Sequence, residues 1–190
     1  MSFVIDQLQR SKTFADDLCA HKTSINFEQI VMYGHSLGGA TAAAAMLSDT
    51  RIKGGMDMDG RFFNPVLQQG LDRPFALLGR PEHRAEDDTW PEFFFNLRGS
   101  RFEMQVAGAA HGSFTDFPVL IDSLDLPEGM KEVVGQVLGS ASGETMDQVI
   151  RSVMVAFCDF VFGKSPAPAI LEKGQKQIPE MTVLRSDIRE

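Results

Sequence analysis

A serine flanked by glycines interrupts the chain between an apolar run and an alanine-rich run. The apolar segment 30–33 suits a buried strand, Gly34-His35-Ser36-Leu37-Gly38 follows at once, and residues 39–48 are rich in alanine. Strand, Gly-x-Ser-x-Gly turn and helix, in this order, are typical of a turn that presents a nucleophilic serine above a sheet. We therefore expect a mixed α/β fold with Ser36 exposed at the carboxyl end of a strand.

The chemistry of such a turn assigns a part to each of its residues. We expect Ser36 to have a strained backbone conformation. Glycines are expected on either side, at Gly34 and Gly38, because a side chain there would collide with the neighbouring strand or helix. The backbone N–H of Leu37 opens the helix and would point at a developing oxyanion. Ser36 is thus the candidate nucleophile, and Leu37 the candidate oxyanion donor.

Composition narrows the class of protein. With 190 residues and 43% hydrophobic content, the chain can bury one substantial core. A net charge of −8 argues against a nucleic-acid partner. Cys19 and Cys158 lie in helical patterns and are expected to be buried free thiols. Because no Cys/His cluster has metal-ligand spacing, we expect neither a metal nor a cofactor.

The sequence assigns no compartment. No window approaches the 18 or so consecutive apolar residues that span a bilayer. The first residues lack the basic segment followed by an apolar one that marks a signal peptide. Localisation is therefore left open.

Helical and strand patterns alternate along the chain, which predicts a parallel sheet covered by helices on both faces. We assign residues 1–165 to one domain and residues 166–190, which are weakly patterned, to a carboxyl-terminal tail. The expected helices are 3–20, 37–48, 89–98 and 145–162, and the expected strands are 29–33, 52–58, 74–79 and 102–107.

A serine nucleophile needs a base, and the chain offers four histidines. His111 follows an expected strand directly and lies among small residues that leave room for a loop to return over the sheet edge. His83 lies in a charged segment that we interpret as a solvated loop. His35 is the variable position of the turn and is expected to pack beside the site and contact substrate, whereas His21 closes the first helix. His111 is therefore the predicted base for Ser36.

The acid that orients this base has several candidates. Asp57 and Asp59 lie at the carboxyl end of the strand after the turn helix, where sites in parallel sheets assemble. Asp59 ends that strand, so it is better placed than Asp57 to meet a histidine from a later loop. The next strand is followed by Glu82, Asp87 and Asp88, all in a charged loop.

Aromatic side chains follow the strand ends: Phe62, Phe63, Trp90 and Phe93–Phe95. Phe62 and Trp90 are candidates for lining an acyl pocket, and core packing explains them at least as well. Three adjacent phenylalanines cannot all face one core. At least one is therefore expected on the surface, in a position to make weak contact with a membrane surface.

Three stretches together, 34–41, 58–60 and 111–116, resemble the platelet-activating factor acetylhydrolase family of the plasma and intracellular isoform II type, with fungal and bacterial homologues most similar. The resemblance covers about residues 1–165. In that family the acid follows the serine by about two dozen residues and the histidine opens a His-x-x-Phe-x-Asp stretch. The resemblance therefore implies an α/β hydrolase fold with Ser36, Asp59 and His111 as nucleophile, acid and base.

The same resemblance implies a substrate. Known members remove short or oxidised acyl chains from the second glycerol position of phospholipids without a metal. The expected function is thus hydrolysis of an sn-2 acetyl or short acyl ester. A general carboxylesterase or polyester hydrolase, and a catalytically incomplete fragment, are the alternatives.

One departure from the family concerns the start of the chain. Only about thirty residues precede Ser36, whereas a complete α/β hydrolase has about a hundred or more, which build several strands and a second oxyanion donor. No His-Gly-Gly-Gly-like segment is present. We therefore interpret the chain as the carboxyl-terminal half of a hydrolase, with a partial fold that lacks the first strands.

Overall fold

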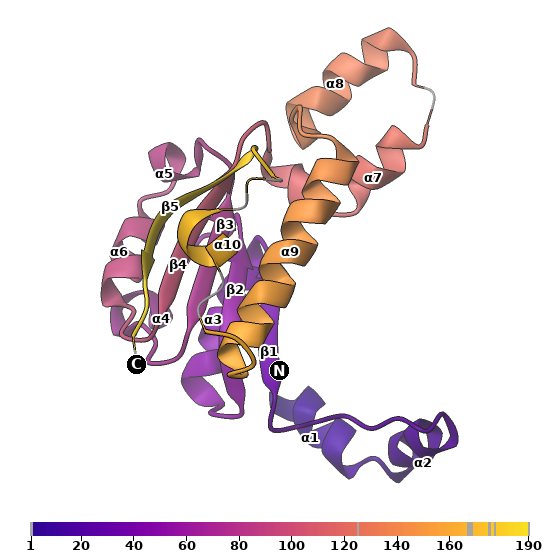
Figure 1. Ribbon diagram of the computed structural model, residues 1–190, viewed down its shortest axis with the longest axis vertical. Helices are drawn as coiled ribbons and strands as arrows, with labels where there is room; N and C mark the ends of the chain where they lie inside the picture. Colours follow the sequence, from indigo (N-terminus) through magenta and orange to yellow (C-terminus); the bar gives the residue numbers. More distant parts are fainter. Residues whose placement is uncertain (1, 125, 167–168, 175, 177, 190) are drawn as a thin grey trace.

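A twisted five-stranded sheet carries the fold (Figure 1). The computed structural model describes residues 2–124, 126–166, 169–174, 176 and 178–189. The strand order follows the chain, β1-β2-β3-β4-β5, with the first four strands parallel and the last antiparallel to its neighbour. The strands are β1 Ile30–His35, β2 Ile52–Met58, β3 Phe75–Gly79, β4 Arg101–Val106 and β5 Met181–Asp187.

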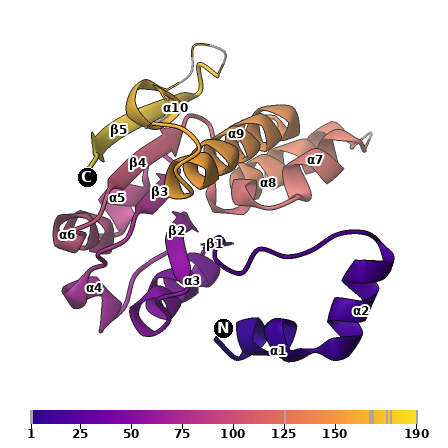
Figure 2. The ribbon, with the colours of Figure 1, turned by 60° about the horizontal axis from the view of Figure 1, so that its bottom comes forward.

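Helices cover both faces of the sheet, as Figure 2 shows, with α3 on one side and α9 and α10 on the other. Helices α7 and α8 extend beyond the sheet at one end, and α1 and α2 at the other (Figure 1). The helices are α1 Ser2–Arg10, α2 Lys12–Ala20, α3 Leu37–Ser48, α4 Val66–Gln69, α5 His83–Glu86, α6 Thr89–Asn96, the 3₁₀ helix η1 His111–Phe114, α7 Phe117–Asp122, α8 Glu128–Leu138, α9 Gly143–Val161 and α10 Ala169–Lys173.

The apolar run of β3 explains why helices are needed on both faces. All five of its residues are buried, and alternate side chains of a strand point to opposite faces. Phe75 and Leu77 pack with side chains of α3 and α6, whereas Ala76 and Leu78 pack with those of α9. A strand buried on both sides reads as continuous apolar sequence, as in other parallel sheets.

Two glycines of β2 let the covering helices approach the sheet closely. A Cβ on Gly55 would lie 2.6 Å from the sulfur of Met46 in α3, and one on Gly54 would lie 2.7 Å from Val161 in α9. The two faces of β2 are therefore shaped for two different helices. This packing fixes α3, and with it the turn that precedes α3.

Residues 166–190 are not the tail expected from the sequence. The segment contributes α10 and β5, and Leu171, Ile178 and Met181 are buried in the core. β5 alternates between more and less buried residues, as a strand covered on one face does. The prediction failed because seven residues of weak alternation resemble a loop in sequence, and because an antiparallel strand breaks the expected parallel pattern.

Two smaller expectations also need correction. The opening helix is broken at Ser11, whose hydroxyl accepts a hydrogen bond from Phe14 N at 3.2 Å and so caps α2 as a separate helix. Cys19 is exposed and Cys158 is half-buried, and both are free thiols.

Among the described residues no helix has the length and apolar character needed to cross a bilayer.

Candidate active site

Ser36 occupies a strained turn between β1 and α3. Its φ is 57° and its ψ is −126°, a conformation that side-chain-bearing residues rarely adopt. The Ser36 N–H donates to the carbonyl of Met58 at 2.9 Å, which ties the turn to the end of β2. A Cβ on Gly34 would lie 2.3 Å from the backbone of Gly38, so this position admits only glycine.

The crowding on the other side of the turn falls on a different glycine from the one expected. A Cβ on Gly38 would meet nothing within 4 Å, whereas one on Gly39 would lie 1.6 Å from the Asp57 carboxylate. The expectation for Gly38 is therefore wrong. Gly39 is the position where α3 presses against the end of β2.

His111 lies between the serine and a carboxylate. Its Nε2 is 3.1 Å from Ser36 Oγ, and its Nδ1 is 2.7 Å from Asp59 Oδ2. The imidazole is exposed on η1, while the Asp59 carboxyl is buried. The three side chains named from the sequence are therefore brought together in a connected row at the carboxyl ends of the parallel strands.

The loop that carries His111 is held by hydrogen bonds to the end of α8 and to the residues that follow it. Ser113 is fully buried, and its hydroxyl accepts from Ala110 N at 2.8 Å and donates to the Leu138 carbonyl at 2.5 Å. The Ser140 N–H donates to the Gly108 carbonyl at 2.7 Å. These bonds hold the segment before η1 and the Ser113 side chain within it, and so restrict where the imidazole can lie.

Asp59 also lies in an unusual backbone conformation, with φ of 55°. Its N–H donates to the carbonyl of Leu78 at 3.0 Å, so the end of β3 supports Asp59 as the end of β2 supports Ser36. Apart from Lys22, Ser36 and Asp59 are the residues other than glycine with positive φ in the described chain. Strain of this kind gathers at functional sites.

The Asp59 carboxylate is bonded by donors on both oxygens. His111 Nδ1 and Arg80 Nε, at 2.7 and 3.1 Å, face Oδ2, and His83 Nδ1 and Arg80 N, at 2.9 and 3.1 Å, face Oδ1. Burial acts to raise the pKa of this carboxyl, but the bonds from His83, His111 and Arg80 outweigh it and lower the pKa to about 2. Asp59 is therefore an anion at neutral pH.

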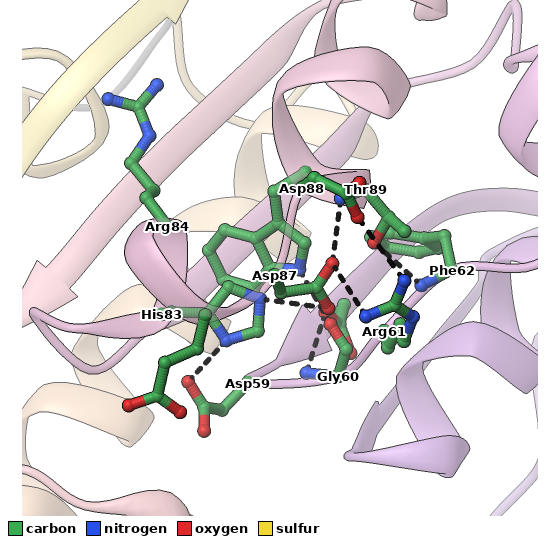
Figure 3. Close-up of polar contacts among 12 residues, drawn as sticks. Asp59, Gly60, Arg61, Phe62, His83, Arg84, Asp87, Asp88 and Thr89 are labelled. Atoms are coloured by element: carbon green, nitrogen blue, oxygen red, sulfur yellow. Dashed lines mark hydrogen bonds and ion pairs between the residues drawn. The ribbon is translucent and has the colours of Figure 1, made fainter.

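His83 is not the solvated loop residue that its charged neighbours suggested. It is only 4% exposed, and its Nδ1 bonds to the Asp59 carboxylate (Figure 3). His111 contacts the same carboxylate through its other oxygen. Its ring lies 3.9 Å from the ring of Trp90. A signal was present in the sequence, since His83 closely follows the strand beside Asp59, but a run of charged residues obscured it.

Asp57, the other acid considered on β2, has a different environment. It is fully buried, and its Oδ2 accepts from Gly60 N at 3.0 Å. Burial raises the pKa of Asp57 well above its usual value, and the nearby charges of Asp59 and Asp87 raise it further. The three acids after β3 do not contact His111. Glu82 is exposed, Asp87 accepts from Thr89 N and pairs with Arg61, and Asp88 accepts from Arg61.

Replacing Asp57 by asparagine is expected to make stability less dependent on pH. Because the folded-state pKa is raised, the stability contributed by this carboxyl is complete below its unfolded pKa, about 3.9, and is lost as pH rises through the folded value. Urea unfolding of Asp57→Asn and wild type should therefore diverge in favour of the variant from pH 5 to pH 8. Asp88→Asn, which removes an exposed carboxylate, is the control, and an equal Asp57→Asn difference at both pH values would contradict the expectation.

His35 and Leu37 lie on either side of Ser36. The His35 ring is 4.5 Å from that of His111, so His35 does pack beside the site. Burial lowers the pKa of His35, and the neighbouring charge of His111 lowers it further, which keeps the ring neutral. Leu37 is the first residue of α3, where backbone N–H groups have no acceptor within the helix.

Phe62 and Trp90 do not line a pocket. Each is 1% exposed, and the Phe62 ring stacks on Phe93 at 3.9 Å. The Trp90 Nε1 donates to the Gly60 carbonyl at 2.6 Å. Core packing therefore accounts for both, and neither can contact a substrate in this structure.

The surface aromatics are their neighbours. Phe63 is 53% exposed and Phe95 is 82% exposed, whereas Phe93 and Phe94 are buried. The expectation that one of the three adjacent phenylalanines faces outward is thus confirmed. Phe63 lies beside Leu37, Thr41 and Pro65, which line a small groove next to the serine turn.

No group of three or more His, Cys, Asp or Glu side chains is arranged to hold a metal ion in the part of the chain that the structure describes.

Arg80, which donates to Asp59 and is also ion-paired with Glu86 at 2.6 Å, is the cation nearest the acid. It was not singled out in the sequence, because its role depends on a contact 21 residues away.

Comparison with known proteins gives consistent results. The family model for platelet-activating factor acetylhydrolase, isoform II, matches residues 11–159. An Arthroderma benhamiae protein named probable 1-alkyl-2-acetylglycerophosphocholine esterase is 26% identical over 82% of this chain and 43% of its own length. A Cavia porcellus platelet-activating factor acetylhydrolase is 25% identical over 84% of this chain and 36% of its own.

A solved structure also matches, that of a ferulic acid esterase from Streptomyces cinnamoneus. It is 27% identical with a TM-score of 0.80, over 97% of this chain and 52% of that one. The fold is therefore that of an α/β hydrolase, as expected. This chain spans less than half the length of the two curated relatives. Because the family model covers most of the chain, the chain belongs to the platelet-activating factor acetylhydrolase family, isoform II.

Proposed function

We propose that the chain carries a serine ester hydrolase site in which Ser36 is the nucleophile, His111 the base and Asp59 the acid. The observation that supports this most strongly is the position of the His111 ring, with Nε2 3.1 Å from Ser36 Oγ and Nδ1 2.7 Å from Asp59 Oδ2. This is the arrangement that acyl transfer by a serine requires. Strained backbone at both Ser36 and Asp59 adds to the case.

The reaction follows from the protonation states. Anionic Asp59 accepts the Nδ1–H of His111, which leaves Nε2 free to accept the hydroxyl proton of Ser36. Ser36 Oγ attacks the ester carbonyl, and the imidazolium then gives its proton to the leaving alcohol. Water activated by the same imidazole releases the acyl group and restores Ser36.

The oxyanion formed during attack needs backbone donors. The N–H of Leu37 is proposed as one, because it opens α3 directly after Ser36. The loss of one such donor typically costs about 2.7–4 kcal/mol in the transition state.

The proposed substrate is the sn-2 acetyl or short acyl ester of a phospholipid. Two relatives bear names that specify this chemistry. The groove beside Leu37, lined by Thr41, Phe63 and Pro65, has a volume of about 160 Å³, which suits a short acyl group better than a long one. Exposed apolar residues next to the His111 loop would make weak contact with a membrane surface: Phe117, Val119, Leu120, Val133 and Val137.

A general carboxylesterase or polyester hydrolase is the second candidate. It is favoured by the likeness to a ferulic acid esterase, whose name points to a different ester. It is also favoured by how exposed the site is, since Leu37 and Phe63 are 68% and 53% exposed and would accept varied leaving groups.

The two candidates differ in their substrate profile. We expect kcat/KM on p-nitrophenyl esters to be highest for acetate or butyrate and to fall with acyl length, because the groove is small. An sn-2 acetyl phospholipid, assayed as monomers and in vesicles, should be hydrolysed faster than its long-chain analogue. Rates on methyl ferulate or a polyester that equal the rate on the sn-2 acetyl phospholipid would favour the second candidate. A preference for long acyl chains would contradict the first candidate and the role given to the groove.

A further inference from the structure

We propose that His83 is a positioning residue that acts through Asp59, holding one carboxylate oxygen so that the other faces His111. This inference rests on the proposed function, since it concerns how the acid of that site is oriented. The site would then contain two histidines on one carboxylate, of which only His111 touches the reacting serine.

The contacts of Asp59 divide cleanly between its two oxygens. His83 Nδ1 lies 2.9 Å from Oδ1, and His111 Nδ1 lies 2.7 Å from Oδ2. An ionised carboxylate can only accept hydrogen bonds, so both Nδ1 atoms carry their protons. His83 is therefore a donor to Asp59, as Figure 3 shows, and it bonds to the carboxylate oxygen that His111 does not contact.

The position of His83 is itself tightly defined. The side chain is 5% exposed, its ring lies 3.9 Å from Trp90, and its Nε2 is 3.6 Å from Asp87 Oδ2. The next residue, Arg84, is ion-paired at 2.6 Å with Glu103, a buried residue of β4. The short helix α5 is thus anchored to the sheet, and its first side chain has little freedom to turn away from Asp59.

A fixed donor matters because a carboxylate rotates about its terminal torsion at little cost. Without His83, Oδ1 keeps only the bond from Arg80 N at 3.1 Å, and more orientations of Asp59 become accessible. In those orientations Oδ2 no longer meets the Nδ1–H of His111. The fraction of molecules with the correct imidazole tautomer and alignment would fall, which lowers kcat and leaves substrate binding unchanged.

Two substitutions separate this role from simple packing. His83→Phe keeps a ring against Trp90 but removes the donor. His83→Asn loses the ring but retains an N–H close to the Nδ1 position. If the donor matters, kcat on p-nitrophenyl acetate should fall about 10- to 100-fold in His83→Phe with KM unchanged. His83→Asn should retain most of the wild-type kcat.

His83→Leu serves as a second variant without a donor, should the phenylalanine variant fail to fold. His21→Phe, the same change at an exposed histidine far from the site, is the matched control. Crystal structures of wild type and His83→Phe supply a readout that does not depend on turnover, because the variant should show the Asp59 carboxylate rotated away from His111.

The outcomes are distinct. If the wild-type chain hydrolyses esters and both His83→Phe and His83→Leu keep its kcat, the positioning role is wrong and the proposed function stands. The same conclusion follows if His83→Asn loses activity while His83→Phe keeps it. An unrotated Asp59 in His83→Phe would also overturn it. Absence of both hydrolysis and fluorophosphonate labelling in the wild-type chain would overturn the proposed function, and this inference with it.

Discussion

Ser36→Ala is expected to reduce ester hydrolysis by about 10⁴- to 10⁶-fold, because the reaction then has no side-chain nucleophile. His111 and Asp59 are undisturbed by this change, since the hydrogen bond of 2.7 Å between them does not involve the serine. KM for a short ester should change little. The measurement is steady-state hydrolysis of p-nitrophenyl acetate at matched protein concentrations.

A serine at the other end of α3 provides the control for that variant. Ser48 is the last residue of α3, and its Oγ donates to the Ala45 carbonyl at 3.2 Å. Ser48→Ala makes the same chemical change as Ser36→Ala and should keep catalysis of the same order as wild type. Comparable rates in Ser36→Ala and wild type would show that the hydroxyl at position 36 does not attack the ester.

Asp59→Asn is expected to lower kcat by about 10⁴-fold, the size of effect seen when the acid of a serine triad is replaced by its amide. An asparagine nitrogen facing His111 would donate rather than accept. It would then stabilise the imidazole tautomer with the proton on Nε2, which cannot take the proton of Ser36. Asp59 also accepts from Arg80 and His83, so some loss of folding stability should accompany the kinetic effect.

Asp57→Asn is the matched control, because it makes the same chemical change two residues earlier, within β2. Asp57 bonds to Gly60 N and not to a histidine, so the variant should retain hydrolysis. Thermal unfolding of both variants separates a kinetic effect from simple loss of the folded state. If Asp57→Asn abolished catalysis and Asp59→Asn did not, the acid would be Asp57.

The sequence predicts the central part of the fold from local patterns, and together with the family resemblance it names the three members of the candidate site. The helix expected over 37–48 and the strand expected over 52–58 have the bounds found for α3 and β2. Asp59 could be preferred over Asp57 because it ends the strand, at the edge of the sheet where sites assemble. Its choice over Glu82, Asp87 and Asp88 came from the resemblance to the family. His111 followed from its place after a strand.

The sequence did not predict the features that depend on contacts across the fold. His83 is buried because Trp90 covers it and Asp59 accepts a hydrogen bond from its Nδ1, and the charged residues around it gave no local sign of either contact. Phe62 and Phe63 are adjacent, so only the direction of the backbone decides which one reaches the core and which faces the groove. β5 forms because β4 offers it an open edge, which is a property of the sheet and not of its seven residues.

The most direct test of the account is to identify the residue that a fluorophosphonate modifies in the wild-type chain. The reagent phosphonylates a serine activated by a base, and mass spectrometry of the digested protein locates the modified residue. The site predicts a single adduct on Ser36 that is lost in His111→Ala, because the 3.1 Å contact with Nε2 activates the hydroxyl. An adduct on another residue, or labelling of Ser36 that survives His111→Ala, would contradict the proposed catalytic row.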